Sequence, residues 1–221
     1  MRIDLHSHSV YSPDSRLTPT ELVKRAKAAG LDGLAVTDHN SLGGANMAFE
    51  YARDLTDFLV IRGLEVSAKE GHVLAYGVKE EVPRNLGTRE TVERIEALGG
   101  VAVAAPPYRF WSGLGEPETL RGKFAAFEVQ NARTLQGGNR RAKNLATLHE
   151  AGGTGGSDAH FLDEVGRAWT VFEDAHTEEG LLNQLWKKKT HGGGADRAVR
   201  GTLRYVPKAI GEWALRGFRR I

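Results

Sequence analysis

The stretch Ile3-Asp4-Leu5-His6-Ser7-His8-Ser9 joins a short apolar run to two histidines that are two residues apart. The apolar run predicts a buried β-strand, and the histidines come where that strand ends. Side chains two residues apart on an extended chain project from the same face, so His6 and His8 can bind one ion together. Imidazole and carboxylate groups are ligands for zinc, manganese or iron. A histidine pair alone is weak evidence, because such pairs also arise by chance.

Three further polar clusters follow apolar runs in the same way. Together the four clusters contain five of the eight histidines of the chain. So many ligand types at strand ends are improbable as independent solvated residues, and they predict one shared metal centre. The further clusters are Thr37-Asp38-His39-Asn40, Gly63-Leu64-Glu65-Val66-Ser67 followed by His72, and Gly156-Ser157-Asp158-Ala159-His160.

Short apolar runs alternate with helix-like patterns, which predicts a parallel α/β fold, either a barrel or an open doubly wound sheet. Polar clusters after several different strands favour a barrel, whose functional groups lie at the carboxyl ends of its strands. We therefore predict a TIM-like barrel of about seven strands, since the chain is short for eight full units. The predicted strands are Ile3–Leu5, Leu34–Val36, Phe58–Ile61, Val73–Tyr76, Val101–Ala105, Phe124–Val129 and Trp169–Phe172.

Helices are expected over residues 18–30, 44–54, 88–98, 140–151 and 177–188. The first has the clearest signals, because Thr18 suits an N-cap, Pro19 suits the first helical position and Glu21 completes a capping box. The segment Pro106–Glu118 is expected to be an irregular excursion from the barrel.

Composition narrows the chemistry further. The chain has 221 residues, enough to bury a full core, and no cysteine, so disulfides and thiolate metal ligands are excluded. No apolar stretch is as long as a transmembrane helix, and residues 1–4 run directly into a strand, which leaves no room for a signal peptide. A cytoplasmic location is the expectation.

The charge is unevenly distributed. The net charge is +2, yet residues 187–221 hold ten Lys and Arg against two acidic side chains, so the rest of the chain is acidic. We predict a barrel domain over residues 1–190, a glycine-rich linker over 191–201 and a basic amphipathic helix over 202–221. This helix can dock on the barrel or on a second copy, or bind nucleic acid or an anionic surface.

Taken together, the four clusters resemble the motifs of the PHP (polymerase and histidinol phosphatase) family of metallophosphoesterases. Asp-Leu-His-Ser-His-Ser is similar to its first motif, Thr-Asp-His-Asn to its second, Gly-Leu-Glu-Val-Ser with His72 to its third, and Gly-Ser-Asp-Ala-His to its last. The resemblance covers residues 3 to 160 and implies a distorted (β/α)7 barrel with up to three metal ions at its rim.

The resemblance also implies a ligand set. One ion is expected on His6, His8, Glu65 and Asp158. A second is expected on Asp14, His39 and His160, while Glu65 and His72 face a third. Zinc, manganese and iron all suit these groups, so two to three divalent ions of open identity are expected.

One position departs from the family pattern. The family usually carries Ala-His-Pro at the end of the strand predicted over 101–105, and that histidine ligates the third ion. This chain has Ala105-Pro106-Pro107-Tyr108-Arg109, and proline offers no side-chain donor. Either the third ion is absent, or Glu65, His72 and water hold it more weakly.

The predicted function is hydrolysis of a phosphate ester, because clustered divalent ions generate a hydroxide nucleophile from bound water and bind phosphate oxygens. The predicted substrate is a small phosphomonoester or a nucleotide phosphate. Arg109 and Arg133 are expected to bind phosphate oxygens, unless they are ordinary surface arginines, and Asn131 is expected beside the substrate or behind the ligands. The residues predicted to be catalytic are His6, His8, Glu65, Asp158 and His160.

Two alternatives stay open. A PHP-type nuclease acting on nucleic-acid ends is favoured by the basic C-terminal segment, while the acidic body disfavours long polyanions. A barrel that has lost catalysis and serves as a binding or scaffold protein is favoured only by Pro106. The oligomeric state is also open.

Overall fold

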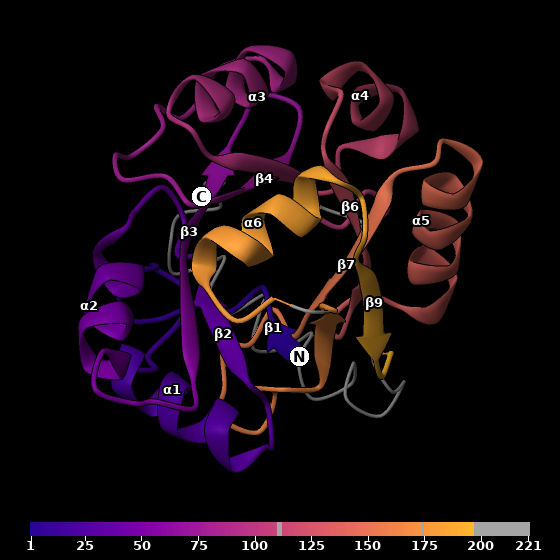
Figure 1. Ribbon diagram of the computed structural model, residues 1–221. Coiled ribbons are helices and arrows are strands. Elements are labelled where there is room, and N and C mark those ends of the chain that lie inside the picture. The colour runs from indigo at the N-terminus through magenta and orange to yellow at the C-terminus, as the bar shows by residue number, and fades with distance from the viewer. Residues whose placement is uncertain (110–111, 174, 197–221) are drawn as a thin grey trace.

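Seven strands, β1 to β7, curve into a nearly closed barrel with helices around it (Figure 1). The computed structural model of the protein describes residues 1–109, 112–173 and 175–196. Within them, nine strands form one sheet in the order β7-β6-β5-β4-β3-β2-β1-β8-β9. The predicted α/β barrel is confirmed.

Six of the seven barrel strands run in one direction. Strands β1 (Arg2–Asp4), β2 (Gly33–Val36) and β3 (Leu59–Ser67) are parallel, and so are β5 (Val101–Ala104), β6 (Ala126–Asn131) and β7 (Gly152–Gly156). Strand β4 (His72–Tyr76) lies between β3 and β5 and is antiparallel to both. Its first residue pairs with Ser67, the last residue of β3. His72 therefore lies at the end of the barrel where the parallel strands finish.

The barrel closes where β7 meets the segment that follows β1. The backbone N–H of Asp158 donates to the carbonyl of His6 at 2.7 Å, and that of His8 donates to the carbonyl of Ala159 at 3.0 Å. A Cβ added at Gly156 would overlap the Cβ of His6, and one added at Gly155 would overlap the carbonyl of Trp169. Glycine is needed for this close approach. Because glycines replace the expected apolar residues, the sequence did not predict β7.

Strands β8 (Ala168–Val171) and β9 (His191–Gly194) extend the sheet: β8 is antiparallel to β1, and β9 is antiparallel to β8. The prediction that a flexible linker begins at residue 191 is wrong for residues 191–194, which pair with β8. The glycines of β9 allow its backbone to pack closely against neighbouring strands, because a Cβ at Gly192 would crowd the carbonyl of Thr154. The rest of the expected linker extends beyond residue 196, and the predicted helix over 202–221 lies outside the described residues.

Helices cover the outside of the barrel and one of its ends (Figure 1). The capping box at Thr18 is present, and Thr177 caps α6. The stretch 115–122, expected to be partly irregular, is helical although it contains Gly115, Pro117 and Gly122. The helices are α1 (Pro19–Ala28), α2 (Gly43–Ala52), α3 (Thr88–Ala97), α4 (Gly115–Gly122), α5 (Gln136–Leu148) and α6 (Glu178–Trp186).

The interior of the barrel is filled with apolar side chains, and the polar clusters lie at its carboxyl end. Leu181 and Leu185 of α6 belong to the same buried cluster as Ile3, Ile61 and Leu74 of the strands. The α6 helix thus closes the end opposite the polar clusters. In the part of the chain described, no helix combines the length and the apolar character needed to span a membrane.

The closure of the barrel can be tested at its glycines. We expect Gly156→Ala to lower the free energy of unfolding by about 1–3 kcal/mol, because the methyl group collides with the backbone at His6. Gly137→Ala is the matched control, since nothing lies within 4 Å of a Cβ built there in α5, and it should be neutral or stabilise by up to about 1 kcal/mol. Urea unfolding followed by circular dichroism measures both, and equal stabilities of the two variants would contradict the closure argument.

Candidate metal centre

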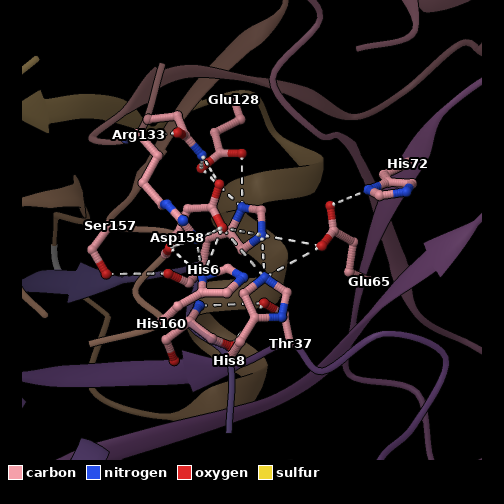
Figure 2. A network of polar contacts seen from close by, with 12 residues as sticks. His6, His8, Thr37, Glu65, His72, Glu128, Arg133, Ser157, Asp158 and His160 are labelled. Atoms are coloured by element: carbon pink, nitrogen blue, oxygen red, sulfur yellow. Dashed lines mark hydrogen bonds and ion pairs between the residues drawn. The ribbon is translucent and has the colours of Figure 1, made fainter. Parts of the chain in front are cut away.

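Residues from five strand ends meet at the carboxyl end of the barrel. Figure 2 shows six of them close together: His6, His8, Glu65, His72, Asp158 and His160. The structure brings all eight predicted ligands together, through a chain of contacts no longer than 3.8 Å. All are buried or nearly so, and only Asp14, His39 and His72 are partly accessible. His6, His8 and Asp14 follow β1, His39 follows β2, Glu65 lies in β3, His72 begins β4, and Asp158 and His160 follow β7.

The first donor set lies around His6 and His8. The Nε2 atoms of His6 and His8 are 3.1 Å apart, and each lies 3.4 Å from Oε2 of Glu65. Oδ1 of Asp158 lies 3.4 Å from Nε2 of His8 and 3.8 Å from Nε2 of His6. His6, His8 and Asp158 are close enough to one another to hold one ion, and Glu65 lies beside the two histidines.

The second donor set is centred on Asp14. Its Oδ2 lies 2.9 Å from Nε2 of His160 and 3.5 Å from Nε2 of His39. The other ring nitrogen of His39 lies 3.4 Å from Oε2 of Glu65, the oxygen that also faces the first set. Glu65 therefore connects the two sets, as expected of a carboxylate that can share its oxygens.

Within this group, His72 makes a polar contact with the outer oxygen of Glu65, and its ring lies edge-on to that of His39 with the centroids 4.9 Å apart. Its Nδ1 lies 2.9 Å from Oε1 of Glu65. Among the described residues, the groups of three donors close enough to hold an ion are His6 with His8 and Asp158, His8 with Asp14 and His160, and His8 with His39 and Glu65. None of these three groups includes His72.

Unsatisfied polar atoms show that the donor sets suit a metal. Oδ1 of Asp14, Nδ1 of His39 and Oδ1 of Asp158 are buried without a hydrogen-bond partner. A buried polar atom without a partner costs about 1–3 kcal/mol. All three atoms belong to predicted ligands, so the residues present fit divalent cations.

The carboxylates of the centre are ionised. Burial raises the pKa of Glu65, but the positive charges of His72 and His39 outweigh it and hold the pKa well below its usual value. Burial likewise raises the pKa of Asp158, and Arg109 with His6 lowers it well below the usual range. For His160, burial and the charge of Arg133 lower the pKa to about 4, so the ring is neutral, as a metal ligand must be.

Residues behind the ligands fix their orientation. The carboxylate of Glu128 lies 3.0 Å from Nδ1 of His6, which leaves Nε2 of that ring facing the donors. The amide of Asn131 donates to Oε1 of Glu128 at 3.2 Å and to Oδ2 of Asp158 at 3.3 Å. Asn131 is fully buried, so the structure supports the expected place behind the ligands and gives no support to its predicted substrate contact.

Two buried aspartates were not predicted as part of the site. Asp4 accepts backbone N–H groups of His6, Ser157 and Gly166, which ties the first and last clusters together. Asp38 accepts both the N–H and the hydroxyl of Ser9 at 2.6 Å. Asp4 and Asp38 lie inside the first and second motifs quoted above, but the motifs do not reveal which backbone N–H groups these carboxylates accept.

The backbone at Asp158 is unusual. Its φ of 53° lies in the left-handed region, which non-glycine residues rarely adopt. The hydrogen bond from its N–H to the carbonyl of His6 holds this conformation. Strained backbone of this kind is concentrated at functional sites.

Both predicted phosphate-binding arginines reach the centre. Nη1 of Arg109 donates to Oδ2 of Asp158. Nη1 of Arg133 contacts Nδ1 of His160 and lies 3.4 Å from the carbonyl of Asp158. Arg133 is only 6% exposed and Arg109 is partly buried, so neither is an ordinary surface arginine.

An α/β barrel with buried histidine and carboxylate donors at its carboxyl end has the architecture of a metal-dependent hydrolase. Comparison with known families agrees. Residues 4–150 match the PHP domain and residues 136–190 match a PHP-associated domain. The chain belongs to the PHP family of metal-dependent phosphoesterases.

Three relatives illustrate the breadth of the similarity. An uncharacterised protein of Methanocaldococcus jannaschii is 34% identical over 118 residues, 49% of this chain and 68% of the relative. A 5'-3' exoribonuclease of Haemophilus influenzae is 30% identical over 192 residues, 81% of this chain and 66% of the relative. A 3',5'-nucleoside bisphosphate phosphatase of Chromobacterium violaceum is 43% identical over 86 residues, 37% of this chain and 29% of that protein.

The fold has a counterpart among solved structures. A two-domain protein of Bacteroides vulgatus, described as containing a predicted PHP-like metal-dependent phosphoesterase, superposes with a TM-score of 0.73 at 21% identity. The match covers 88% of this chain and 64% of that one. This likeness concerns the fold alone.

Metal binding should stabilise the folded chain. Adding Zn²⁺ or Mn²⁺ at about 100 times its dissociation constant should raise the free energy of unfolding of the apo protein by about 2.7 kcal/mol for each ion bound, because the ions bind only the folded donor sets. Glu65→Gln should remove most of this gain, since Glu65 serves both sets. Asp57→Asn, at an exposed surface pair with Lys27, is the control and should respond like wild type. Thermal unfolding with and without metal measures the gain, and an equal gain in Glu65→Gln would contradict the site.

Proposed function

We propose that this chain hydrolyses a small phosphomonoester or a nucleotide phosphate at the centre formed by its eight ligands. The observation that carries the proposal is that two donor sets share Glu65 while two guanidinium groups reach Asp158 and His160 beside them. Adjacent ions with fixed arginines are the arrangement that binds the oxygens of a phosphate group.

The proposed ions would be held by His6, His8, Glu65 and Asp158 in one set and by Asp14, His39 and His160 in the other. Their identity as zinc, manganese or iron stays a prediction. When bound, such ions activate water as a nucleophile near neutral pH and neutralise charge on the phosphate.

The side chains of the protein supply the rest of the mechanism. Glu128 fixes the ring of His6, so that Nε2 keeps its direction when substrate binds. Arg109 and Arg133 are proposed to bind the phosphate oxygens that develop charge in the transition state. The apolar filling of the barrel keeps water away from the inner side of the centre.

The relatives support phosphate-ester hydrolysis in two forms. The similarity to a nucleoside bisphosphate phosphatase favours a small nucleotide substrate, although it spans 37% of this chain. The similarity to an exoribonuclease spans 81% of this chain and favours the second candidate, hydrolysis of nucleic-acid ends. The basic segment after residue 186 is consistent with this second candidate. A cytoplasmic location and the anionic partners of that segment stay predictions, and the oligomeric state stays open.

A substrate panel separates the candidates. The apo protein, reloaded with Mn²⁺ or Zn²⁺, is assayed against phosphomonoesters, nucleoside bisphosphates and short oligonucleotides. We expect release of phosphate from the small substrates and none after chelation. Cleavage of oligonucleotides alone would favour the nuclease, and an inert metal-loaded protein would refute the proposed function.

Arg109 provides a sharper test of phosphate binding. Arg109→Ala should lower kcat/KM about 10²–10³-fold, because a donor aimed at the transferring phosphate is lost. Arg109→Lys keeps the charge but loses the two-pronged geometry, so it should recover only part of that loss. Arg94→Ala, at an exposed position of α3, is the control. Equal kcat/KM in Arg109→Ala and the control would exclude the assigned role.

A further inference from the structure

We propose that this centre holds two divalent ions, and that His72 is a positioning residue for Glu65 rather than a ligand of a third ion. The inference deepens the proposed function and rests on it, because it concerns the ions of the same site. It is argued from the two oxygens of Glu65, the neighbours of His72 and the charge of the rim.

The two oxygens of Glu65 have different surroundings. Oε2 faces both donor sets, at 3.4 Å from His6, His8 and His39. Oε1 points the other way and is 2.9 Å from Nδ1 of His72, as Figure 2 shows. A hydrogen bond from a ring nitrogen to an ionised carboxylate is short and strong. His72 thereby fixes the rotation of the carboxylate and keeps Oε2 directed at the ions.

Within residues 1–109, 112–173 and 175–196, no third donor completes a site at His72. On the side of β4 away from β3 lies β5, and the first residues after β5 are Ala105 and the buried Pro106, neither of which has a side-chain ligand atom. Among the described residues, no group of three close donors contains His72. An ion beside His72 would have two protein ligands among these residues, His72 and Glu65, and Glu65 already faces the other ions.

The loop after β5 supplies a guanidinium instead. The N–H of Arg109 donates to the carbonyl of Pro106 at 3.1 Å, which closes a turn with Pro107 at its second position. This turn directs the side chain of Arg109 onto Oδ2 of Asp158. Oδ1 of Asp158 is left without a hydrogen-bond partner, and it faces the first donor set.

The charge of the rim also suits two ions. Metal ligands are deprotonated carboxylates and neutral imidazoles, so Asp14, Glu65 and Asp158 together with Arg109 and Arg133 would carry a net charge of −1 when ions are bound. Two divalent ions bring this to +3, which a phosphomonoester dianion largely neutralises, and a third ion would bring it to +5. Uncompensated charge in a buried site is unfavourable.

The first experiment counts ions. Apo protein is reloaded with Zn²⁺, passed through a desalting column and measured by elemental analysis. We expect two equivalents in wild type and three in Pro106→His, which adds a donor next to His72. Three equivalents in wild type, or two in Pro106→His with His72 intact, would overturn the assignment of this position.

The second experiment separates positioning from ligation at His72. The amide nitrogen of asparagine can take the place of Nδ1 as a hydrogen-bond donor, but asparagine is a poor ligand for zinc. His72→Asn should keep two equivalents with nearly wild-type affinity. His72→Ala should keep two at saturation with affinity lowered about 10–100-fold, the usual effect of removing a group that orients a ligand. Loss of one equivalent in both variants would show that His72 is a ligand.

Titration of the apo variants with Zn²⁺ by calorimetry gives the affinities, and circular dichroism confirms that each variant is folded. These readouts do not depend on catalysis. A wild-type protein that binds two ions but hydrolyses nothing refutes the proposed function and leaves the ion count standing, whereas an active protein with three ions refutes the inference alone.

Discussion

The contact between the segments that follow β1 and β7 is the constraint on which the site depends. One hydrogen bond, from the N–H of Asp158 to the carbonyl of His6, brings ligands 152 residues apart in the chain into one donor set. Asp4 reinforces this contact by accepting N–H groups from both segments. Without closure, the parallel strands would still form a sheet, but the first and last clusters would lie at opposite edges.

The buried polar and charged groups of this region also stabilise one another, so the loss of one leaves others without a partner. Three ionised carboxylates and several imidazoles are buried together, and each is tolerated only because the others compensate its charge or hydrogen-bond it. Three of the buried polar atoms that have no hydrogen-bond partner, on Asp14, His39 and Asp158, belong to the donor sets. The fold has therefore arranged its polar groups for ions, and the surrounding apolar core provides the energy that keeps them buried.

The parts of the molecule that were predictable from sequence are those encoded locally. Short motifs at strand ends identified seven of the eight candidate ligands, the resemblance to the PHP family added Asp14, and a capping box identified α1. What was missed depends on contacts distant in sequence. Strands β7 and β9 consist largely of glycine, whose role emerges only where another backbone approaches. Asp4 and Asp38 bind backbone N–H groups. The place of Arg109 follows from a loop whose path no motif specifies, and that of Asn131 follows from the pairing of β6, whose last residue it is.

The left-handed backbone of Asp158 restricts what can ever occupy that position. A β-branched or bulky side chain is strained at a φ of 53°, and glycine, which fits the backbone, has no ligand atom. Asparagine would keep the shape while removing the charge. The backbone conformation and the need for a ligand atom therefore each limit which residues can replace Asp158. Few substitutions at this position would leave both the fold and the metal site unchanged.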